Sequence, residues 1–556
     1  MRRIALLTAA ALAVLFLFLL ATAPPLPVSA SPVFDEALLA RTIPGAWHVH
    51  SRVSDGAADR DDIAAAAARA GLRFVVFTDH GDGTRVPEPP RYAQGVLLVD
   101  AVEISTNGGH YIALDMRRAP FPLGGEAAAV IEDVRRLGGF GIAAHPYSAR
   151  SDLEWTDWDA PFDGLEWLNA DSEWRDESVL RLARLPFDYL LRPSQALASA
   201  LDRPVAALER WDAMIARRPL VGLAAHDAHG GLSAREDAGF GLPGLPSYEA
   251  GFRAFAIRAI VDAALEGSAP DDARLVLDAI RRGRVFSAID AVAAPAQLDF
   301  VAAAGAHQAR MGDALPFDTG IELIVRTTLP DGGSLALLCD GREAGVSGSG
   351  ELRLRPGGPM ACRPEVRAPG APGAPPVPWI VGNAIYLLSA VIEPVGAEPM
   401  YETTLGLDHL DWAVEKDPGS EGALAPENRA FTLQYRLRDD VRASQYVAAA
   451  ASLAPPVPPF DRILFTAEAS APMRVSVQLR FDGGERWIHS VFVEPDARRA
   501  IVPVSALVRA GGGDGVRPDF RNASSILFVV DLVNAVPGAA GVLRISDLAF
   551  ARLAGS

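Results

Sequence analysis

The chain has 556 residues, 22% of them charged, and a formal net charge of −17. An acidic chain is repelled by nucleic acid and by anionic membrane surfaces, so neither is expected as the main partner. Hydrophobic residues make up 49% of the chain, a share typical of globular proteins. The length predicts two to four domains.

Residues 1–30 predict a targeting segment. Arg2 and Arg3 precede an uncharged apolar run at residues 4–23, and small residues follow up to Ala30. This order is typical of a signal peptide, but the run is also long enough for an uncleaved N-terminal membrane anchor. Either alternative predicts an exported protein, periplasmic or extracellular, and the anchor would hold it at the inner membrane.

The chain has two cysteines, Cys339 and Cys362. In an exported protein they can form one disulfide, and the alternative is a pair of buried free thiols. The sequence does not decide between these alternatives. Neither cysteine lies close in sequence to the histidines described below, so a metal site there would use nitrogen and oxygen ligands.

Residues 44–294 alternate between helical stretches and short apolar runs. The predicted helices are 61–70, 126–137, 206–217 and 271–282, and the predicted strands are 72–77, 95–102, 140–144, 164–168 and 220–225. This βαβ alternation predicts a parallel α/β domain, in which chemically active residues lie at the carboxyl ends of strands.

The rest of the chain has the pattern of β structure. Residues 295–395 predict a small β domain with a Pro/Gly-rich loop at 356–378. Residues 410–554 predict a β-sandwich that resembles jelly-roll, galactose-binding-like or carbohydrate-binding modules. Three of its aromatic residues can either stack on sugars or lie in its core: Trp412, Tyr435 and Trp487.

Seven of the ten histidines fall between residues 48 and 229. They lie in short polar pieces, most of which follow predicted strands: His48 and His50, Asp79 and His80, Glu103 and His110, His145, and His226, Asp227 and His229. Neutral imidazoles and carboxylates are ligands of Mn, Zn and Fe, so this clustering predicts a metal site.

Spacing indicates which side chains can share a metal ion. His48 and His50 are two residues apart, as are Asp227 and His229, and alternate residues of a strand face the same side. Glu103 can bridge two ions because a carboxylate has two oxygens. The spacing therefore allows His48 and His50 to hold one ion together, and Glu103 to join two ions.

Other residues near the site have two interpretations each. Asp79 would orient a neighbouring imidazole or cap a turn, and His226 would support the site or lie in the core. Asp55 lies in a Ser-Asp-Gly loop, where it is either a ligand or an ordinary turn residue. His110 is either a ligand or an exposed loop residue, and Arg52 is either a phosphate contact or a solvated arginine.

Taken together, these pieces resemble the PHP family (polymerase and histidinol phosphatase) over about residues 46–292. The matching motifs are His48-Val49-His50-Ser51, Ser54-Asp55-Gly56, Phe77-Thr78-Asp79-His80, Val102-Glu103, Gly109-His110, Ala144-His145-Pro146 and Asp227-Ala228-His229. The resemblance implies a distorted (β/α)7 barrel with two or three divalent metal ions, Mn, Zn or Fe.

The resemblance also assigns ligands to each ion. The first ion would be held by His48, His50, Glu103 and Asp227, the second by Glu103, His110 and His145, and the third by Asp55, His80 and His229. A water held between the ions near Glu103 and Asp227 would attack the substrate. The third ion is the one that the motif supports least, since some members have histidine at the position of Asp55.

The function implied is that of a metal-dependent phosphoesterase acting on a small anionic ester. One alternative follows from Pro378-Trp379-Ile380 and Asn383-Ala384-Ile385-Tyr386, which resemble a PHP branch that includes carbaryl-hydrolysing enzymes. That resemblance implies a carbamate, amide or carboxylic ester as substrate. A second alternative is a non-catalytic surface protein whose sandwich binds a glycan.

Overall fold

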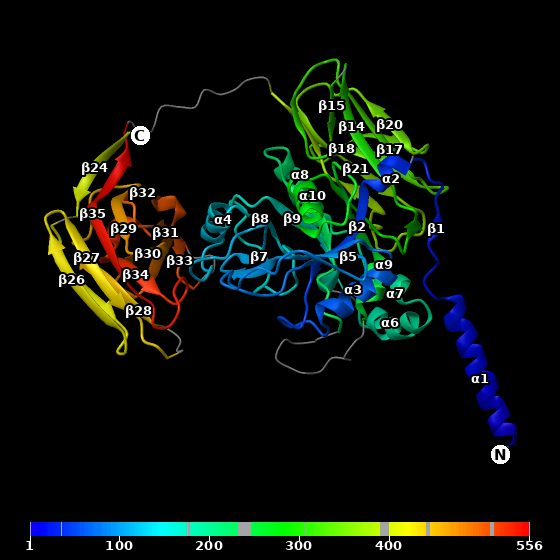
Figure 1. The fold of residues 1–556 in the computed structure, drawn as a ribbon, viewed down its shortest axis with the longest axis horizontal. Helices are drawn as coiled ribbons and strands as arrows, with labels where there is room; N and C mark the ends of the chain where they lie inside the picture. The colour runs from blue at the N-terminus through cyan, green and yellow to red at the C-terminus, as the bar shows by residue number, and fades with distance from the viewer. Residues whose placement is uncertain are drawn as a thin grey trace.

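The computed structural model describes most of the chain and divides it into three bodies of structure (Figure 1). The described residues are 2–34, 36–173, 175, 178–231, 246–305, 307–389, 400–407, 409–440, 445–511 and 516–554. Within them the chain forms ten α-helices and 35 β-strands. The predicted end of the small β domain, at residue 395, lies outside the described residues.

A five-stranded sheet forms one half of the central body. Its order is β10 (Val221–Ala225), β9 (Gly164–Asn169), β8 (Phe140–Ala143), β7 (Gly109–Leu114) and β6 (Val102–Thr106). β8, β9 and β10 are parallel, whereas β7 is antiparallel to both β6 and β8. Nearly all residues of β7 to β10 are buried, as expected for strands covered on both faces.

A twelve-stranded sheet forms the other half and continues into the small β region. In the central body it contains β4 (Arg91–Ala93), β5 (Val96–Asp100), β3 (Phe74–Phe77), β2 (Thr42–Val49), β11 (Ala256–Ile260) and β12 (Val285–Ala288). β12 then pairs with β22 (Ile380–Gly382). The sheet therefore runs across residue 294, where the sequence predicts a domain boundary.

The predicted (β/α)7 barrel is wrong. A barrel of that kind needs parallel strands that close on themselves, but the structure has two separate sheets and is dominated by strands. Antiparallel pairs interrupt the parallel order at β4–β5, β2–β11, β11–β12, β6–β7 and β7–β8. β6 and β7 are joined by a tight turn at residues 107–108, which leaves no room for the crossover helix that parallel strands require.

The four predicted helices are confirmed as α3 (Arg60–Arg69), α4 (Ala127–Arg136), α8 (Val205–Ile215) and α10 (Ala269–Arg281). In α10 the apolar residues recur at helical spacing, and Ala273, Val276, Leu277 and Ile280 are buried against the sheet. Further helices have no counterpart among the predicted elements: α2 (Glu36–Ala40), α5 (Ala170–Glu173), α6 (Val179–Leu191), α7 (Pro193–Ser199) and α9 (Tyr248–Ala254).

The small β region adds strands on the far side of β12. β22 pairs with β21 (Met360–Arg367), and β21 also pairs with β18 (Ser334–Cys339) and β23 (Ile385–Leu388). β23 pairs with β16 (Ala314–Pro316), and β18 with β19 (Arg342–Ser347). A four-stranded sheet contains β14 (Leu298–Ala304), β15 (His307–Arg310), β17 (Glu322–Thr327) and β20 (Glu351–Leu354), and β1 (Val28–Ser29) pairs with β13 (Ala293–Ala294).

A disulfide joins Cys339 of β18 to Cys362 of β21, which face each other in register. The two cysteines are therefore bridged and are not free thiols. The Pro/Gly-rich stretch at 356–378 is only partly a loop, because β21 lies inside it.

The C-terminal body is a β-sandwich, as predicted. One sheet contains β26 (Glu421–Glu427), β27 (Ala430–Arg436), β35 (Ala540–Leu553), β29 (Arg462–Ala469), β32 (Arg498–Pro503) and β24 (Tyr401–Gly406). The other contains β25 (Trp412–Lys416), β28 (Tyr446–Ser452), β34 (Ser525–Asp531), β30 (Met473–Arg480), β31 (Arg486–Val493) and β33 (Val508–Arg509). The inner faces of the two sheets share one hydrophobic core.

A buried arginine joins the sandwich to the central body. The Arg474 guanidinium, on β30, donates to both carboxylate oxygens of Asp133, on α4, at 2.6 and 2.9 Å, and to Glu132 Oε2 at 2.7 Å. The Arg474 side chain is 1% exposed and that of Asp133 is 4% exposed. Because the pair is removed from water, its loss leaves an uncompensated buried charge.

The N-terminal helix α1 (Arg2–Ala21) projects from the central body in Figure 1. Over the residues that the structure describes, no helix has both the length and the apolarity that crossing a membrane requires.

We predict that Arg474→Met lowers the free energy of unfolding by about 3–5 kcal/mol, because it leaves Asp133 buried without a partner. The double variant Arg474→Met, Asp133→Leu should recover most of this loss, since an apolar pair needs no countercharge. Urea denaturation followed by tryptophan fluorescence measures both effects. Arg274→Met, which removes an exposed ion pair with Asp271, is the control and should leave the midpoint unchanged. An equally small effect of Arg474→Met would contradict the interpretation.

Candidate metal centre

The ends of strands from both large sheets meet at one place. Val49, at the end of β2, forms a parallel bridge with Ala228, just after β10. His80, just after β3, forms a second parallel bridge with Glu103 in β6. The backbone thus links the twelve-stranded sheet to the five-stranded sheet at two points, and the side chains at these points converge.

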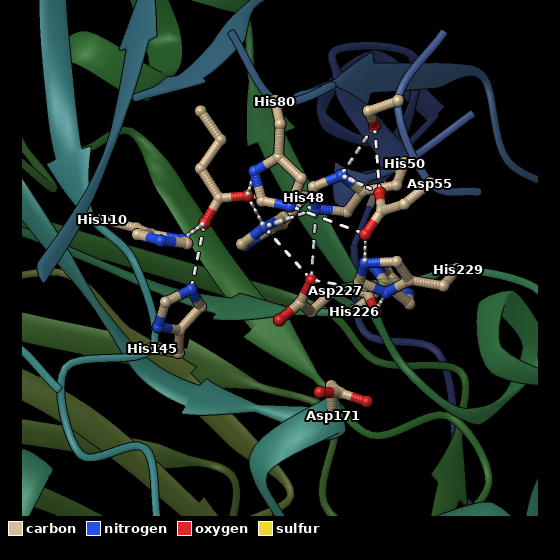
Figure 2. A network of polar contacts seen from close by, with 12 residues as sticks. His48, His50, Asp55, His80, His110, His145, Asp171, His226, Asp227 and His229 are labelled. Carbon is tan, nitrogen blue, oxygen red and sulfur yellow. Dashed lines mark hydrogen bonds and ion pairs between the residues drawn. The ribbon is translucent and has the colours of Figure 1, made fainter. Parts of the chain in front are cut away.

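All nine predicted ligands lie in one cluster, most of which is seen in Figure 2: His48, His50, Asp55, His80, Glu103, His110, His145, Asp227 and His229. Three overlapping groups of potential ligand atoms lie within 4.8 Å of one another: His50, Asp55, His80 and His229; His48, His50 and Glu103; and His80, Glu103 and His110. The structure therefore brings together every residue of the predicted ligand set.

Glu103 lies at the centre of the cluster and is 1% exposed. Its Oε1 lies 2.8 Å from His110 Nδ1 and 3.0 Å from His145 Nε2. Its Oε2 lies 3.2–3.3 Å from imidazole nitrogens on the other side, those of His48, His50 and His80. Each carboxylate oxygen therefore faces a different set of imidazoles, the arrangement that a bridging ligand needs.

Asp227 completes the Oε2 side. Its Oδ1 lies 3.2 Å from His48 Nε2 and 3.3 Å from His50 Nε2, and these two nitrogens are 3.1 Å apart. Asn169 Nδ2 donates to the other oxygen of Asp227 at 3.2 Å. The expectation that His48 and His50 face the same side is confirmed.

The third predicted set lies on the solvent side. Asp55 Oδ2 is 3.2 Å from His229 Nε2 and 3.6 Å from His80 Nε2, and its Oδ1 is 3.3 Å from His50 Nδ1. The side chains of Asp55, His80 and His229 are 37%, 31% and 25% exposed, whereas the other members of the cluster are nearly buried. Solvent therefore reaches the cluster from this side.

The backbone at three of these residues has an unusual conformation. His48, His145 and Asp227 have φ values of 60°, 28° and 46°, in the left-handed region that non-glycine residues rarely adopt. Such conformations cost free energy and persist where the surrounding structure imposes them, often at functional sites. Here they turn the side chains out of the strand ends and into the cluster.

Glu166, which the sequence prediction missed, is hydrogen-bonded to residues of the cluster. Its Oε1 accepts hydrogen bonds from Trp47 Nε1 at 2.9 Å and from His48 Nδ1 at 2.7 Å. Its Oε2 accepts from the backbone N–H of His145 at 2.7 Å and from Asn169 Nδ2 at 2.9 Å. By accepting from Nδ1 it directs His48 Nε2 toward the cluster, which is how buried carboxylates orient metal-binding histidines. The available signal was a lone charge inside the apolar strand 164–168.

Asp79 lies under the loop that carries Asp55. It accepts from the backbone N–H of Ser51 at 2.7 Å, from Ser54 Oγ at 2.9 Å and from Arg60 Nη2 at 2.7 Å. Of the two interpretations of Asp79, these contacts fit the capping of a turn, because its hydrogen-bond partners are Ser51, Ser54 and Arg60 and not an imidazole.

His226 points away from the cluster and stacks on Phe255, with ring centroids 4.2 Å apart. Its two nitrogens face the backbone carbonyls of Phe255 and Trp47, and burial lowers its pKa to about 4. It is therefore a neutral core residue. Arg52 is exposed and pairs with Asp59. It is therefore a solvated arginine, as the second of its two interpretations predicts.

Electrostatics in the cluster is dominated by its carboxylates. Burial by itself would lower the pKa of His48, but Asp227, Glu166 and Glu103 outweigh it and hold that pKa well above the ordinary value. Burial would raise the pKa of Glu103, but His48, His110 and His145 hold it well below the ordinary value. The site therefore attracts positive charge, either as protons on imidazoles or as metal cations.

The donor set fits divalent metal ions. Six imidazoles and three carboxylates supply only nitrogen and oxygen atoms, the ligands of Zn, Mn and Fe sites. Bound cations would take the place of the protons that the carboxylates otherwise draw onto the imidazoles, so binding should strengthen as the pH rises.

No family model and no curated protein matches this chain. Solved structures with partial similarity include carbohydrate-binding modules. A family 11 module from Clostridium thermocellum, in complex with a beta-1,3-1,4-mixed-linked tetrasaccharide, is 15% identical, covers 26% of this chain and 94% of its own, and has a TM-score of 0.22. A family 29 module is 10% identical, covers 28% of this chain and 90% of its own, and has a TM-score of 0.18.

We predict that Glu166→Gln weakens Mn²⁺ binding about 10–100-fold, because the amide cannot accept from all four donors and releases the orientation of His48. Titration calorimetry of the metal-free protein with Mn²⁺ measures the effect. Glu209→Gln, an exposed glutamate on α8, is the matched control and should bind like the wild type. An unchanged Kd in Glu166→Gln would show that Glu166 serves stability alone.

Proposed function

We propose that this protein is a metal-dependent hydrolase that acts on a phosphate ester. The observation that carries the proposal is the position of Glu103, whose two oxygens face imidazoles on opposite sides in a buried site. Structural metal sites are closed by their ligands, whereas a site that acts on substrate keeps an open side. Here Asp55, His80 and His229 leave such a side.

The nine residues would serve as metal ligands in three groups. Glu103 would bridge two ions, with His48, His50 and Asp227 on one side and His110 and His145 on the other; Asp55, His80 and His229 would hold a third ion. Bound ions would polarise the ester, lower the pKa of an attacking water and offset the charge of an anionic substrate.

Neighbouring side chains hold the proposed ligands in position. Glu166 fixes the direction of the His48 ring, and Asn169 fixes one oxygen of Asp227, so that the other faces the imidazoles. Asp55 Oδ2 and His229 Nε2 lie 3.2 Å apart on the partly exposed side, so the third set of ligands is in place where substrate would approach. These contacts exist before substrate binds, which reduces the reorganisation needed for reaction.

Resemblance to PHP motifs supports a phosphate ester, and resemblance to the carbaryl-hydrolysing branch supports a carbamate, amide or carboxylic ester as the alternative. The donor set is compatible with either, since the same Lewis acid can activate water against phosphorus or a carbonyl carbon. We also infer that the protein is exported, because the N-terminal apolar run and the disulfide both fit an oxidising compartment.

We predict that the Mn²⁺-loaded protein hydrolyses p-nitrophenyl phosphate or bis-p-nitrophenyl phosphate, that a chelator abolishes the activity, and that Mn²⁺ restores it. Glu103→Gln should lower the rate to background because it removes the charge that two ions share. The assay measures released p-nitrophenol, with metal content determined on the same sample. Glu209→Gln is the matched control and should retain activity.

Other outcomes are equally informative. Release of 1-naphthol from 1-naphthyl methylcarbamate, with no release from either phosphate ester, would replace the phosphoesterase proposal with the carbonyl alternative. A protein that binds no metal under any loading would overturn the hydrolase proposal altogether.

A second candidate function is glycan binding by the sandwich. A cleft of about 120 Å³ lies between β30, β31, β34 and the central body. Within the described part of the chain, the buried atoms Gln478 Oε1, Ser490 Oγ and Glu126 Oε1 of its lining have no hydrogen-bond partner. Unpaired buried polar atoms are costly, and sugar hydroxyls would satisfy them.

Of the three aromatic residues that could stack on sugars, Trp487 lies in the core, and Trp412 and Tyr435 are partly buried and pack against it. Trp487 is 4% exposed and packs edge-on against Phe520. Trp412 packs on Phe431 with centroids 4.4 Å apart, and Tyr435 packs against the same core. Glycan binding would therefore depend on the polar cleft.

We predict that, if the cleft binds glycans, mixed-linked β-1,3-1,4-glucan retards the full chain in affinity electrophoresis and that Gln478→Leu abolishes the retardation by removing an acceptor. Gln434→Leu on the other sheet, where Gln434 is exposed, is the matched control. An unretarded wild-type protein would remove this glucan as the ligand.

A further inference from the structure

A cavity of about 550 Å³ adjoins the metal centre, within the usual range for small-molecule sites. It lies between α5, α6, α7, α9 and the segment 226–231. Asp227 and His229, both members of the cluster, are part of its wall. The cavity and the metal centre are therefore one continuous site.

The rest of the wall is mostly apolar. Leucines 182, 185, 190, 197 and 201 line it, together with Phe255 and the alanines 200 and 254. The polar residues of the wall include Asp171, Asp227 and His229. Asp171, labelled in Figure 2, pairs with Arg175, whose Nη2 lies 2.8 Å from Asp171 Oδ2. A ligand that fills this space needs a polar group at the cluster and an extended apolar part beside it.

Helix α6 carries apolar residues on two faces. One face lines the cavity with Leu182, Leu185 and Tyr189. The other is open to solvent: Val179, Leu180, Phe187 and Leu190 are 82%, 85%, 51% and 79% exposed. Leu190 belongs to both faces, since it lines the cavity and is exposed. The apolar surface thus continues from the outside into the cavity.

The exposed face of α6 lies beside a second apolar surface. Arg184 of α6 donates to Leu19 O at 3.3 Å and to Thr22 Oγ1 at 2.8 Å, at the end of α1. Of the described side chains of α1, Val14, Phe16, Leu17 and Phe18 are also exposed. Clusters of exposed apolar side chains of this kind mark contact with a partner or a lipid surface.

We propose, on the basis of the proposed hydrolase function, that the cavity binds the hydrocarbon chain of an amphiphilic ester. The ester group lies at Asp227 and His229, and the chain lies between α6, α7 and α9. The substrate reaches the cavity from a lipid surface along the exposed face of α6. This assigns the substrate class: a phosphate ester that carries an alkyl or acyl chain.

The first test is a series of alkyl p-nitrophenyl phosphate diesters from ethyl to decyl, offered as monomers. Burying one methylene corresponds to about a fourfold gain in affinity, so kcat/KM should rise by up to that factor for each added methylene until the cavity is filled. Hydrolysis of all esters at equal kcat/KM would overturn the inference and leave the proposed hydrolase function standing.

Gly251 offers a variant that fills the cavity. It lies in α9, lines the cavity, and a Cβ added there meets nothing within 4 Å. Gly251→Phe should bring the ratio of kcat/KM for the decyl and ethyl esters close to one, while Gly251→Ala is the control and should keep the wild-type ratio. Both replacements remove a glycine from a helix, so neither is expected to impair folding. An unchanged ratio in Gly251→Phe would overturn the assignment of the cavity.

A binding measurement separates this inference from the hydrolase proposal. Titration calorimetry with dodecyl phosphate should show binding to the wild type and about a tenfold or greater loss in Gly251→Phe. If no ester is hydrolysed but this binding pattern is found, the hydrolase proposal fails and the cavity assignment stands. If dodecyl phosphate does not bind, the cavity assignment fails.

The lipid surface has its own test. The decyl ester is supplied as monomers or embedded in phosphatidylcholine vesicles, and the variant Leu180→Ser, Phe187→Ser is compared with the wild type. The variant should lose activity on vesicles at least tenfold more than on monomers, because it removes apolar contacts outside the cavity. Equal losses on both would overturn the lipid surface as the source of the substrate.

Discussion

The buried carboxylate of Glu103 is the group on which the site depends. A charge with 1% exposure is costly unless it is paired, and here the countercharge comes from five imidazoles on β2, β3, β7 and β8 or directly after them. Because these strands belong to two different sheets, Glu103 also joins the halves of the central body. The bridges His80–Glu103 and Val49–Ala228 hold the backbone at the same place, so the fold and the site constrain each other.

Two further carboxylates surround this centre without belonging to the predicted ligand set. Glu166 binds Trp47, His48, the backbone of His145 and Asn169, and Asp79 ties the loop of Asp55 to Arg60. Each accepts hydrogen bonds from residues on separate elements. A buried carboxylate whose oxygens accept several hydrogen bonds is held in one orientation. Glu166 thereby fixes the direction of the His48 ring, and Asp79 fixes the loop that carries Asp55.

Sequence predicted the site better than the fold, and the reason is physical. Ligand type and alternate spacing are local properties, so His48 with His50, and Asp227 with His229, can be interpreted without knowing which strands pair. Helices such as α10 are likewise predictable from their apolar spacing. The direction of a strand and its partner depend on contacts between residues that are distant in sequence. The antiparallel pairing of β11 with β2 and β12 therefore cannot be predicted from an alternation of strands and helices. Glu166 was missed because its role arises from four donors that only the fold assembles.

The β-sandwich contacts the central body away from the cavity that adjoins the proposed metal site. Its buried contact, Arg474 with Asp133, is made to α4, and Asn534 adds hydrogen bonds to the backbone of residues 122 and 124. In the described residues, no side chain of the sandwich lines the cavity beside Asp227 and His229. Residues within 170–171, 182–201, 226–231 and 246–255 supply that wall, which lies next to the end of β10. In the proposed hydrolase, these segments would therefore select the substrate, and no described side chain of the sandwich would take part.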